Sequence, residues 1–99
     1  MSLIHYEKDF KELIKESAVV DFYATWCGPC KMFGPIFEET SNEFDMNFIK
    51  LDVDKSSDIA REYGVMTIPT IILFKNGNEV KRHTGFMSKT DLLNFINEK

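Results

Sequence analysis

The chain has 99 residues, 43% of them hydrophobic, and carries a formal net charge of -4 with no run of basic residues. Its length and composition fit one folded domain over residues 1–99, and its acidic balance argues against nucleic acid or an anionic membrane as a partner. No apolar stretch is long enough to cross a bilayer, and charged residues come too early for a secretory signal, so we expect a cytoplasmic protein.

Extended and helical patterns alternate along the chain. The predicted elements, in chain order, are a strand at residues 3–6, a helix at 9–16, a strand at 18–24, a helix at 28–44, a strand at 46–53, a helix at 57–63, strands at 70–74 and 79–84, and a helix at 88–97. The strand at 18–24 is almost continuously apolar, which is typical of a central strand covered on both faces. Pro35 predicts a kink in the second helix, because proline removes a backbone donor.

Two local motifs shape the last third of the chain. Asn76-Gly77 lies between two strand patterns and predicts a hairpin turn. Ser88 precedes the last helix, with Asp91 three residues on, and so predicts an N-terminal cap. The whole order of elements predicts an α/β fold, in which a parallel sheet core is extended by an antiparallel hairpin and helices cover both faces.

Both cysteines of the chain, Cys27 and Cys30, lie where the strand at 18–24 meets the helix at 28–44. Pro29 suits the first helical turn, where its missing N–H leaves no donor unpaired. The free N–H groups and dipole of a helix N-terminus favour negative charge, which predicts a lowered pKa for the Cys27 thiol. Cys30 follows one turn later and can reach the Cys27 sulfur, so a mixed disulfide formed at Cys27 could be resolved.

Three other interpretations of the cysteine pair compete with redox chemistry. A structural disulfide across so short a loop would constrain the unfolded chain very little. A zinc site needs further ligands, and His5 and His83 lack metal-ligand spacing, so we expect no metal. Two buried, inert thiols are the third interpretation. The position between strand and helix favours redox chemistry over all three.

Asp21 and Pro69 are unusual for the strand patterns in which they stand. Asp21 stands in the apolar strand at 18–24, where a buried carboxylate costs several kcal/mol unless it is paired or protonated. Either this position is exposed, or the carboxyl lies beneath the dithiol with a raised pKa and moves a proton for Cys30. Pro69 opens a strong strand, where its missing N–H does least harm, and the default expectation for its peptide bond is trans.

The run Trp-Cys-Gly-Pro-Cys-Lys at residues 26–31 resembles the active-site signature of the thioredoxin family. Further matches in the family's order and spacing are residues 20–24, 50–54, 63–65, 68–70, 74–77 and Gly85. The set covers almost the whole chain and is far more specific than a Cys-x-x-Cys alone. A lowered thiol pKa is a known property of this family's cysteine pair, so that expectation is not particular to this chain.

The resemblance implies a thioredoxin fold, with a central mixed five-stranded sheet flanked on both faces by four helices. It implies a monomeric protein disulfide reductase without a bound cofactor. Cys27 would attack disulfides of diverse target proteins, and Cys30 would resolve the mixed disulfide and leave a Cys27–Cys30 disulfide. A thioredoxin reductase drawing on NADPH would then restore the dithiol.

The resemblance also assigns residues around the dithiol. Asp21 matches the family's buried acid, Lys50 the lysine near that acid, and Pro69 a cis-proline beside the dithiol. The backbone next to Pro69 would pair with an extended target segment. The expected docking rim around it consists of Trp26, Gly28, Pro29, Thr67, Ile68, Pro69, Gly85 and Phe86.

Four positions depart from the family's common pattern. Tyr23 stands where many members have Trp, Met66 replaces a basic residue, Thr67 a small one, and Phe86 is larger than usual. Three of these positions lie on or beside the docking rim, which puts target preference rather than chemistry in doubt. Two other functions stay open at this point: a more oxidising isomerase or disulfide donor, and a non-catalytic interaction subunit built on the same fold.

Overall fold

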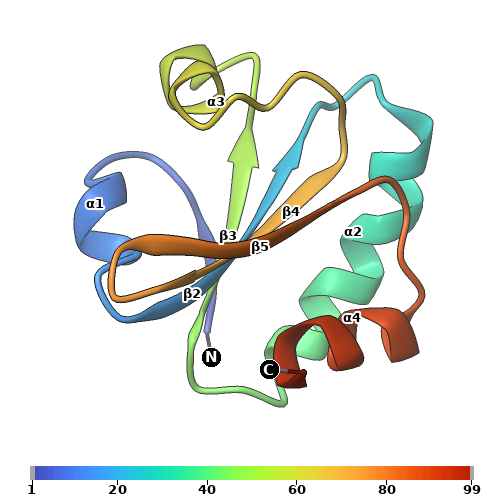
Figure 1. The fold of residues 1–99 in the computed structure, drawn as a ribbon. Helices are drawn as coiled ribbons and strands as arrows, with labels where there is room; N and C mark the ends of the chain where they lie inside the picture. The colour runs from blue at the N-terminus through green and yellow to red at the C-terminus, as the bar shows by residue number, and fades with distance from the viewer. Residues whose placement is uncertain (1, 99) are drawn as a thin grey trace.

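The computed structural model describes residues 2–98 and has the predicted order of elements (Figure 1). The elements are β1 (Leu3–His5), α1 (Phe10–Leu13), β2 (Ser17–Tyr23), α2 (Gly28–Ser41), β3 (Asn47–Asp52), α3 (Ser57–Glu62), β4 (Thr70–Lys75), β5 (Asn78–Thr84) and α4 (Lys89–Asn97). The two end residues of the expected domain lie outside the described residues.

The strands form one mixed sheet in the order β1-β3-β2-β4-β5. β1 and β2 run parallel to β3, whereas β4 runs antiparallel to β2 and β5 antiparallel to β4. The hairpin turns at Asn76 and Gly77, whose φ angles of 54° and 82° are both positive, as a tight turn between twisted strands requires. This arrangement confirms the predicted fold class and the predicted hairpin.

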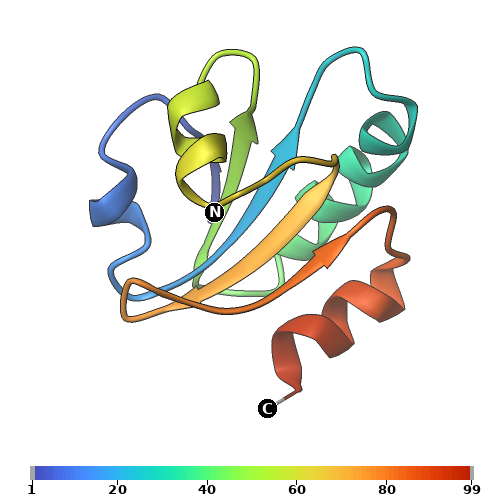
Figure 2. The ribbon, with the colours of Figure 1, turned by 45° about the horizontal axis from the view of Figure 1, so that its top comes forward.

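Two helices cover each face of the sheet (Figures 1 and 2). One core cluster joins Phe10 of α1 and Ala60 of α3 to Val20 of β2, and the other joins Phe33 of α2 to Val19 of β2. Successive residues of a strand point to opposite faces. Both faces of β2 are therefore buried, which explains its continuous apolar sequence and places Asp21 on the same face as α2 and α4.

The first helix is shorter than predicted. The pattern indicated residues 9–16, but α1 ends at Leu13. The carbonyl of Ile14 accepts a hydrogen bond from the Gly77 N–H (2.9 Å), and that of Glu16 accepts one from the Asn76 N–H (3.0 Å). Because these carbonyls accept hydrogen bonds from the β4–β5 turn, a tertiary contact rather than a local sequence signal ends α1.

The second helix ends at Ser41 rather than at the predicted Phe44. The Ser2 hydroxyl donates to the carbonyls of Ser41 (2.5 Å) and Phe44 (2.8 Å), and this contact fixes the turn that follows the helix. The helix runs on through Pro35, and the kink there stays a prediction. With 14 residues α2 is the longest helix, and within residues 2–98 we find none with both the length and the apolar character to cross a membrane.

The predicted cap of the last helix is confirmed. The Ser88 hydroxyl accepts a hydrogen bond from the Asp91 N–H (3.1 Å), and the Asp91 carboxylate accepts one from the Ser88 N–H (3.4 Å). This reciprocal pair satisfies two backbone donors at the helix start. It fixes α4 beside α2, where Leu92 and Ile96 enter the core.

Candidate active site

Cys27 and Cys30 stand at the N-terminus of α2, directly after the segment that leaves β2. Cys27 is the N-terminal cap, with an extended backbone (φ -92°, ψ 118°), and Pro29 lies in the first turn as predicted. The Cys30 N–H points at the Cys27 sulfur, with 3.3 Å between N and Sγ. One of the free backbone donors of the helix start is thus directed at the sulfur of Cys27.

The two sulfurs are joined in a disulfide, with the Cα atoms 5.2 Å apart. Both residues are nearly buried, Cys27 with 6% and Cys30 with 5% of its surface exposed. Cys27 Sγ lies 3.8 Å from the carbonyl oxygen of Ile68. Within the described chain we find no group of three His, Cys, Asp or Glu side chains that could hold a metal ion.

Ile68 belongs to the loop between α3 and β4, which passes next to the disulfide. The Ile68–Pro69 peptide bond is cis, as the family resemblance implied and contrary to the default expectation of trans. The Pro69 carbonyl accepts a hydrogen bond from the Gly85 N–H (2.8 Å). This bond brings the loop after β5 to the same end of the sheet, so three loops surround the disulfide.

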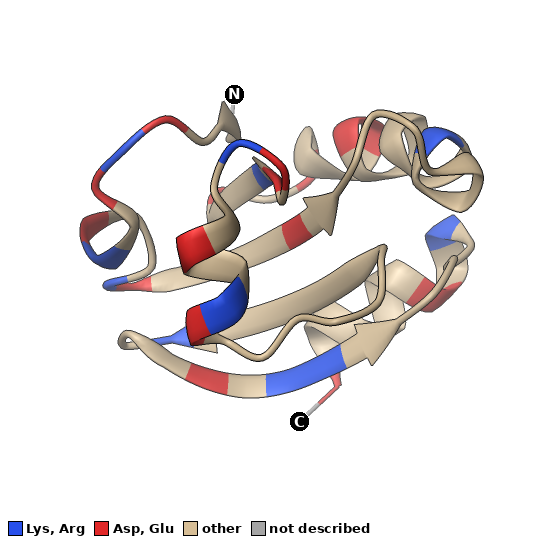
Figure 3. Cartoon of the chain, turned by 90° about the horizontal axis from the view of Figure 1, so that it is seen from above, with Lys and Arg blue, Asp and Glu red and all other residues tan. Residues whose placement is uncertain are grey.

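Most of the predicted docking rim is exposed, but Pro69 is buried and Ile68 and Gly85 are half-buried. Figure 3, seen from this end of the molecule, shows an uncoloured loop beside the start of α2, and residues 24–30, 64–69 and 85–88 include no charged side chain. Trp26 is 68% exposed, Phe86 44% and Met66, next to Thr67 in the sequence, 93%. The Trp26 indole donates to the Asp54 carboxylate (2.8 Å), a contact that the sequence analysis did not foresee.

The sequence alone leaves open whether Asp21 is exposed. The structure buries it completely, with 0% of its surface exposed. Neither carboxylate oxygen has a hydrogen-bond partner among the described residues. Burial raises the pKa of Asp21 from 3.8 to about 7, and the positive charge of Lys50 only partly opposes that rise. The structure therefore excludes the exposed position, and the carboxyl can exchange a proton near neutral pH.

Lys50 lies directly opposite Asp21, because the two residues are register partners on β3 and β2. A hollow of about 310 Å³ opens beside Lys50, and Cys30 and Glu38 are also among its lining residues. Lys50 Nζ lies 3.8 Å from Glu38 Oε1. Glu38 was not predicted as a site residue, although Cys30, Gly34 and Glu38 recur every four residues and so share one side of α2.

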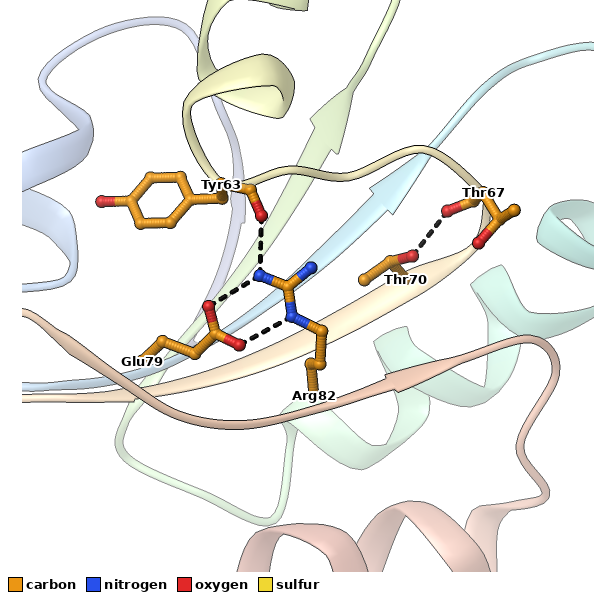
Figure 4. A network of polar contacts seen from close by, with 5 residues as sticks. All are labelled: Tyr63, Thr67, Thr70, Glu79 and Arg82. Atoms are coloured by element: carbon orange, nitrogen blue, oxygen red, sulfur yellow. Dashed lines mark hydrogen bonds and ion pairs between the residues drawn. The ribbon is translucent and has the colours of Figure 1, made fainter.

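A second polar network lies on the other face of the sheet (Figure 4). Arg82 of β5 binds both carboxylate oxygens of Glu79, at 2.6 and 2.7 Å, and donates to the Tyr63 carbonyl at 2.6 Å. This pairing lowers the pKa of Glu79. The Thr70 hydroxyl donates to the Thr67 carbonyl (2.5 Å). Together these bonds fix both ends of the loop that carries Pro69.

Known proteins resemble this chain over nearly its whole length. The family model for thioredoxin matches residues 2–98. A thioredoxin of Mycoplasma genitalium is 46% identical over 84 residues, which are 84% of this chain and 82% of the relative. A thioredoxin of Staphylococcus epidermidis is 42% identical over 95 residues, covering 93% and 91%.

Solved structures agree with these sequence matches. The crystal structure of Schistosoma mansoni thioredoxin superposes with a TM-score of 0.89 at 40% identity, covering 98% of this chain and 94% of that one. The thioredoxin of Malassezia sympodialis gives 0.88 at 38% identity, covering 98% and 90%. The fold of this chain thus occurs in thioredoxins of distant organisms.

Proposed function

Because this chain belongs to the thioredoxin family and is a protein disulfide reductase with Cys27 and Cys30 as its redox pair, we propose roles for the residues around that pair. The observation that carries the proposal is the convergence at the start of α2. Cys27 Sγ lies there between the Cys30 N–H and the Ile68 carbonyl, and the buried Asp21 lies on the same face of the sheet.

Cys27 attacks the target disulfide. A thiolate is the reactive form of a cysteine, and the free N–H groups at the start of α2 favour it. Its sulfur forms a bond to one target sulfur, and the target disulfide breaks and releases the other sulfur as a thiolate. The product of this first step is a mixed disulfide between Cys27 and the target.

Cys30 completes the reduction, with Asp21 as its base. The Asp21 carboxylate takes the proton of the Cys30 thiol, directly or through water, and the Cys30 sulfur then attacks Cys27 Sγ. The bond between Cys27 and the target breaks, the target leaves as a thiolate, and the Cys27–Cys30 disulfide remains. A base with a pKa of about 7 suits this transfer, since it is partly ionised at neutral pH and still accepts protons well.

The exposed rim binds the target. The Ile68 carbonyl and the cis-proline present backbone beside the disulfide, and an extended target segment can pair with it as an added strand. The apolar side chains of Trp26, Met66 and Phe86 surround this place. An apolar patch without charges suits many targets rather than one. The remaining residues of the proposed rim are Gly28, Pro29, Thr67 and Gly85.

We further propose the cellular setting that the family implies. A thioredoxin reductase, supplied with electrons by NADPH, restores the Cys27–Cys30 dithiol after each turnover. The protein acts in the cytoplasm as a monomer, and residues 1–99 form one thioredoxin domain.

A coupled assay tests the proposal. The chain is mixed with NADPH, a thioredoxin reductase and a model protein that contains a disulfide, and NADPH oxidation is followed. We expect turnover that depends on Cys27 and slows when Asp21 is replaced. A chain that the reductase reduces but that leaves the model disulfide intact would instead fit an interaction subunit, and unchanged rates across pH without Asp21 would remove it from the mechanism.

A further inference from the structure

Lys50 is the register partner of Asp21, but its ammonium makes no hydrogen bond to the Asp21 carboxylate. Lys50 and Asp21 are register partners on neighbouring parallel strands, and both point to the α2 face of the sheet. Yet both Asp21 oxygens lack a hydrogen-bond partner among the described residues. Lys50 Nζ instead lies 3.8 Å from Glu38 Oε1 and 4.8 Å from the centre of the Tyr23 ring. A carboxylate and an aromatic face thus share the cation.

Gly34 provides the space for this arrangement. A Cβ atom added at Gly34 would lie 3.4 Å from Lys50 Nζ, in direct contact with the ammonium. The neighbouring hollow of about 310 Å³ includes Cys30 and Glu38 in its lining. The Glu38 side chain is 48% exposed and that of Lys50 only 14%, so the ion pair leads from solvent toward the buried site.

We propose that Glu38 is a positioning residue for proton exchange at Cys30. It holds the Lys50 ammonium on the α2 side of the hollow and keeps that charge from pairing closely with the Asp21 carboxylate. Glu38 acts through Lys50 and does not touch the sulfurs. The inference rests on the proposed role of Asp21 as the base for Cys30.

The reason lies in the strength of the base. When Cys30 resolves the mixed disulfide, its thiol proton moves to the Asp21 carboxylate while the Cys27–Cys30 bond forms and the target thiolate leaves. An ammonium close to that carboxylate would stabilise its ionised form and make it a weaker base. By sharing the Lys50 charge, Glu38 preserves the high pKa that burial gives Asp21.

The other groups on this face leave Lys50 as the cation nearest to the acid. The titratable groups on this face are His5 on β1, Lys50 and Asp52 on β3, Tyr23 on β2 itself, and Cys30, Lys31 and Glu38 on α2. Burial, followed by the charges of Asp52 and Asp21, raises the pKa of the Tyr23 hydroxyl. From β4 and α4 the face receives Ile71 and Leu92, which do not titrate.

The experiment reads the Asp21 carboxyl directly. Its carbon resonance is titrated by NMR in the oxidised protein, and the pH dependence of mixed-disulfide resolution is measured in parallel by stopped flow. We expect Glu38→Gln to lower both midpoints by about half a pH unit, because the cation is released toward Asp21. The matched control is Glu39→Gln, on the same helix, whose carboxylate pairs with Lys89 at 2.7 Å and which should leave both midpoints in place.

A second background separates the two proposals. In Lys50→Gln protein, the shift caused by Glu38→Gln should vanish, because the charge that Glu38 positions is gone. A shift of the same size without Lys50, or no shift with it, would overturn the positioning role. If the carboxyl resonance shifts as expected while Asp21→Asn leaves the resolution rate unchanged, Glu38 still positions Lys50 and it is the base role of Asp21 that fails.

Discussion

Asp21 and Arg82 lie on opposite faces of the same sheet and differ in their hydrogen-bond partners. Arg82 of β5 is the register partner of Ile72, and its side chain has a hydrogen-bonded acceptor in both Glu79 and the Tyr63 carbonyl. Asp21 of β2 is fully buried, and neither of its oxygens has a hydrogen-bond partner among the described residues. The first arrangement stabilises a loop, whereas the second keeps an acid ready to exchange a proton at a cost in stability.

The comparison separates polar groups that support the fold from those that serve the reaction. A surface network whose polar groups are paired contributes little to stability, so breaking it should cost little free energy of unfolding. An unpartnered buried carboxyl lowers stability, and titratable groups perturbed in this way cluster at functional sites. The substitutions below test this distinction, beginning with the largest expected effect.

Replacing either cysteine should have the largest effect on activity. Cys27→Ser removes the attacking sulfur, and we expect no detectable reduction of a model disulfide in the coupled assay. Cys30→Ser keeps the attack but removes the resolving sulfur, so a mixed disulfide should accumulate and be visible on a non-reducing gel. Sustained reduction of the model disulfide by Cys30→Ser protein would show that release of the target from the mixed disulfide does not need the second thiol.

Asp21→Asn should slow mixed-disulfide resolution by roughly tenfold to a hundredfold, because the amide cannot accept the Cys30 proton. The acid limb of the pH–rate profile, which we expect near the pKa of about 7, should disappear with the carboxyl. Stopped-flow rates between pH 5 and 9 measure both effects. Asn47→Asp, which adds a carboxylate at a half-buried position of β3 outside the site, serves as a control and should leave the limb unchanged.

Asp21→Asn should also raise the free energy of unfolding, and this gain should grow with pH. The folded pKa of Asp21 is raised from 3.8 to about 7, so between these values the native protein holds more protons than the unfolded chain. Wild-type stability contributed by this group therefore falls as pH rises through that window. We expect Asp21→Asn to add almost nothing below the window and roughly 2–4 kcal/mol above it, as measured by urea unfolding. A gain independent of pH would contradict the assignment.

Arg82→Gln should have the smallest effect. The Arg82 and Glu79 side chains are 32% and 31% exposed, and ion pairs near the surface contribute about 1 kcal/mol or less. We expect a loss of that size in urea unfolding and turnover within about twofold of wild type, since the disulfide and Asp21 are untouched. A large loss of activity with normal stability would show that the network takes part in target binding and would break the comparison.

Much of the fold and of the site can be predicted from the sequence, and the features that cannot be predicted have physical causes. The Cys-x-x-Cys pair and the lone acid in an apolar strand identify Cys27, Cys30 and Asp21, because composition and spacing alone make them unusual. The ends of α1 and α2 were mispredicted, since the turn at Gly77 and the hydroxyl of Ser2 fix them from far along the chain.

Glu38 and Arg82 show why the rest of the site is harder to predict. Glu38 has the sequence pattern of an ordinary solvated residue on a long helix, and only the packing of α2 against the face of β3 that carries Lys50 brings the two side chains together. Arg82 meets Tyr63 through a loop whose course no local pattern specifies. Partners that depend on strand register and loop path become visible only in three dimensions.

The order of the strands also bears on how the protein behaves in a crowded solution. One edge of the sheet, β1, offers just three residues for pairing. The other, β5, is seven residues long and mostly exposed, but carries Glu79, Lys81 and Arg82 along its length. A foreign strand would have to dehydrate these charges in order to join the sheet. The fold thereby discourages aggregation at its edges, while the uncharged end of the sheet remains free to receive substrates.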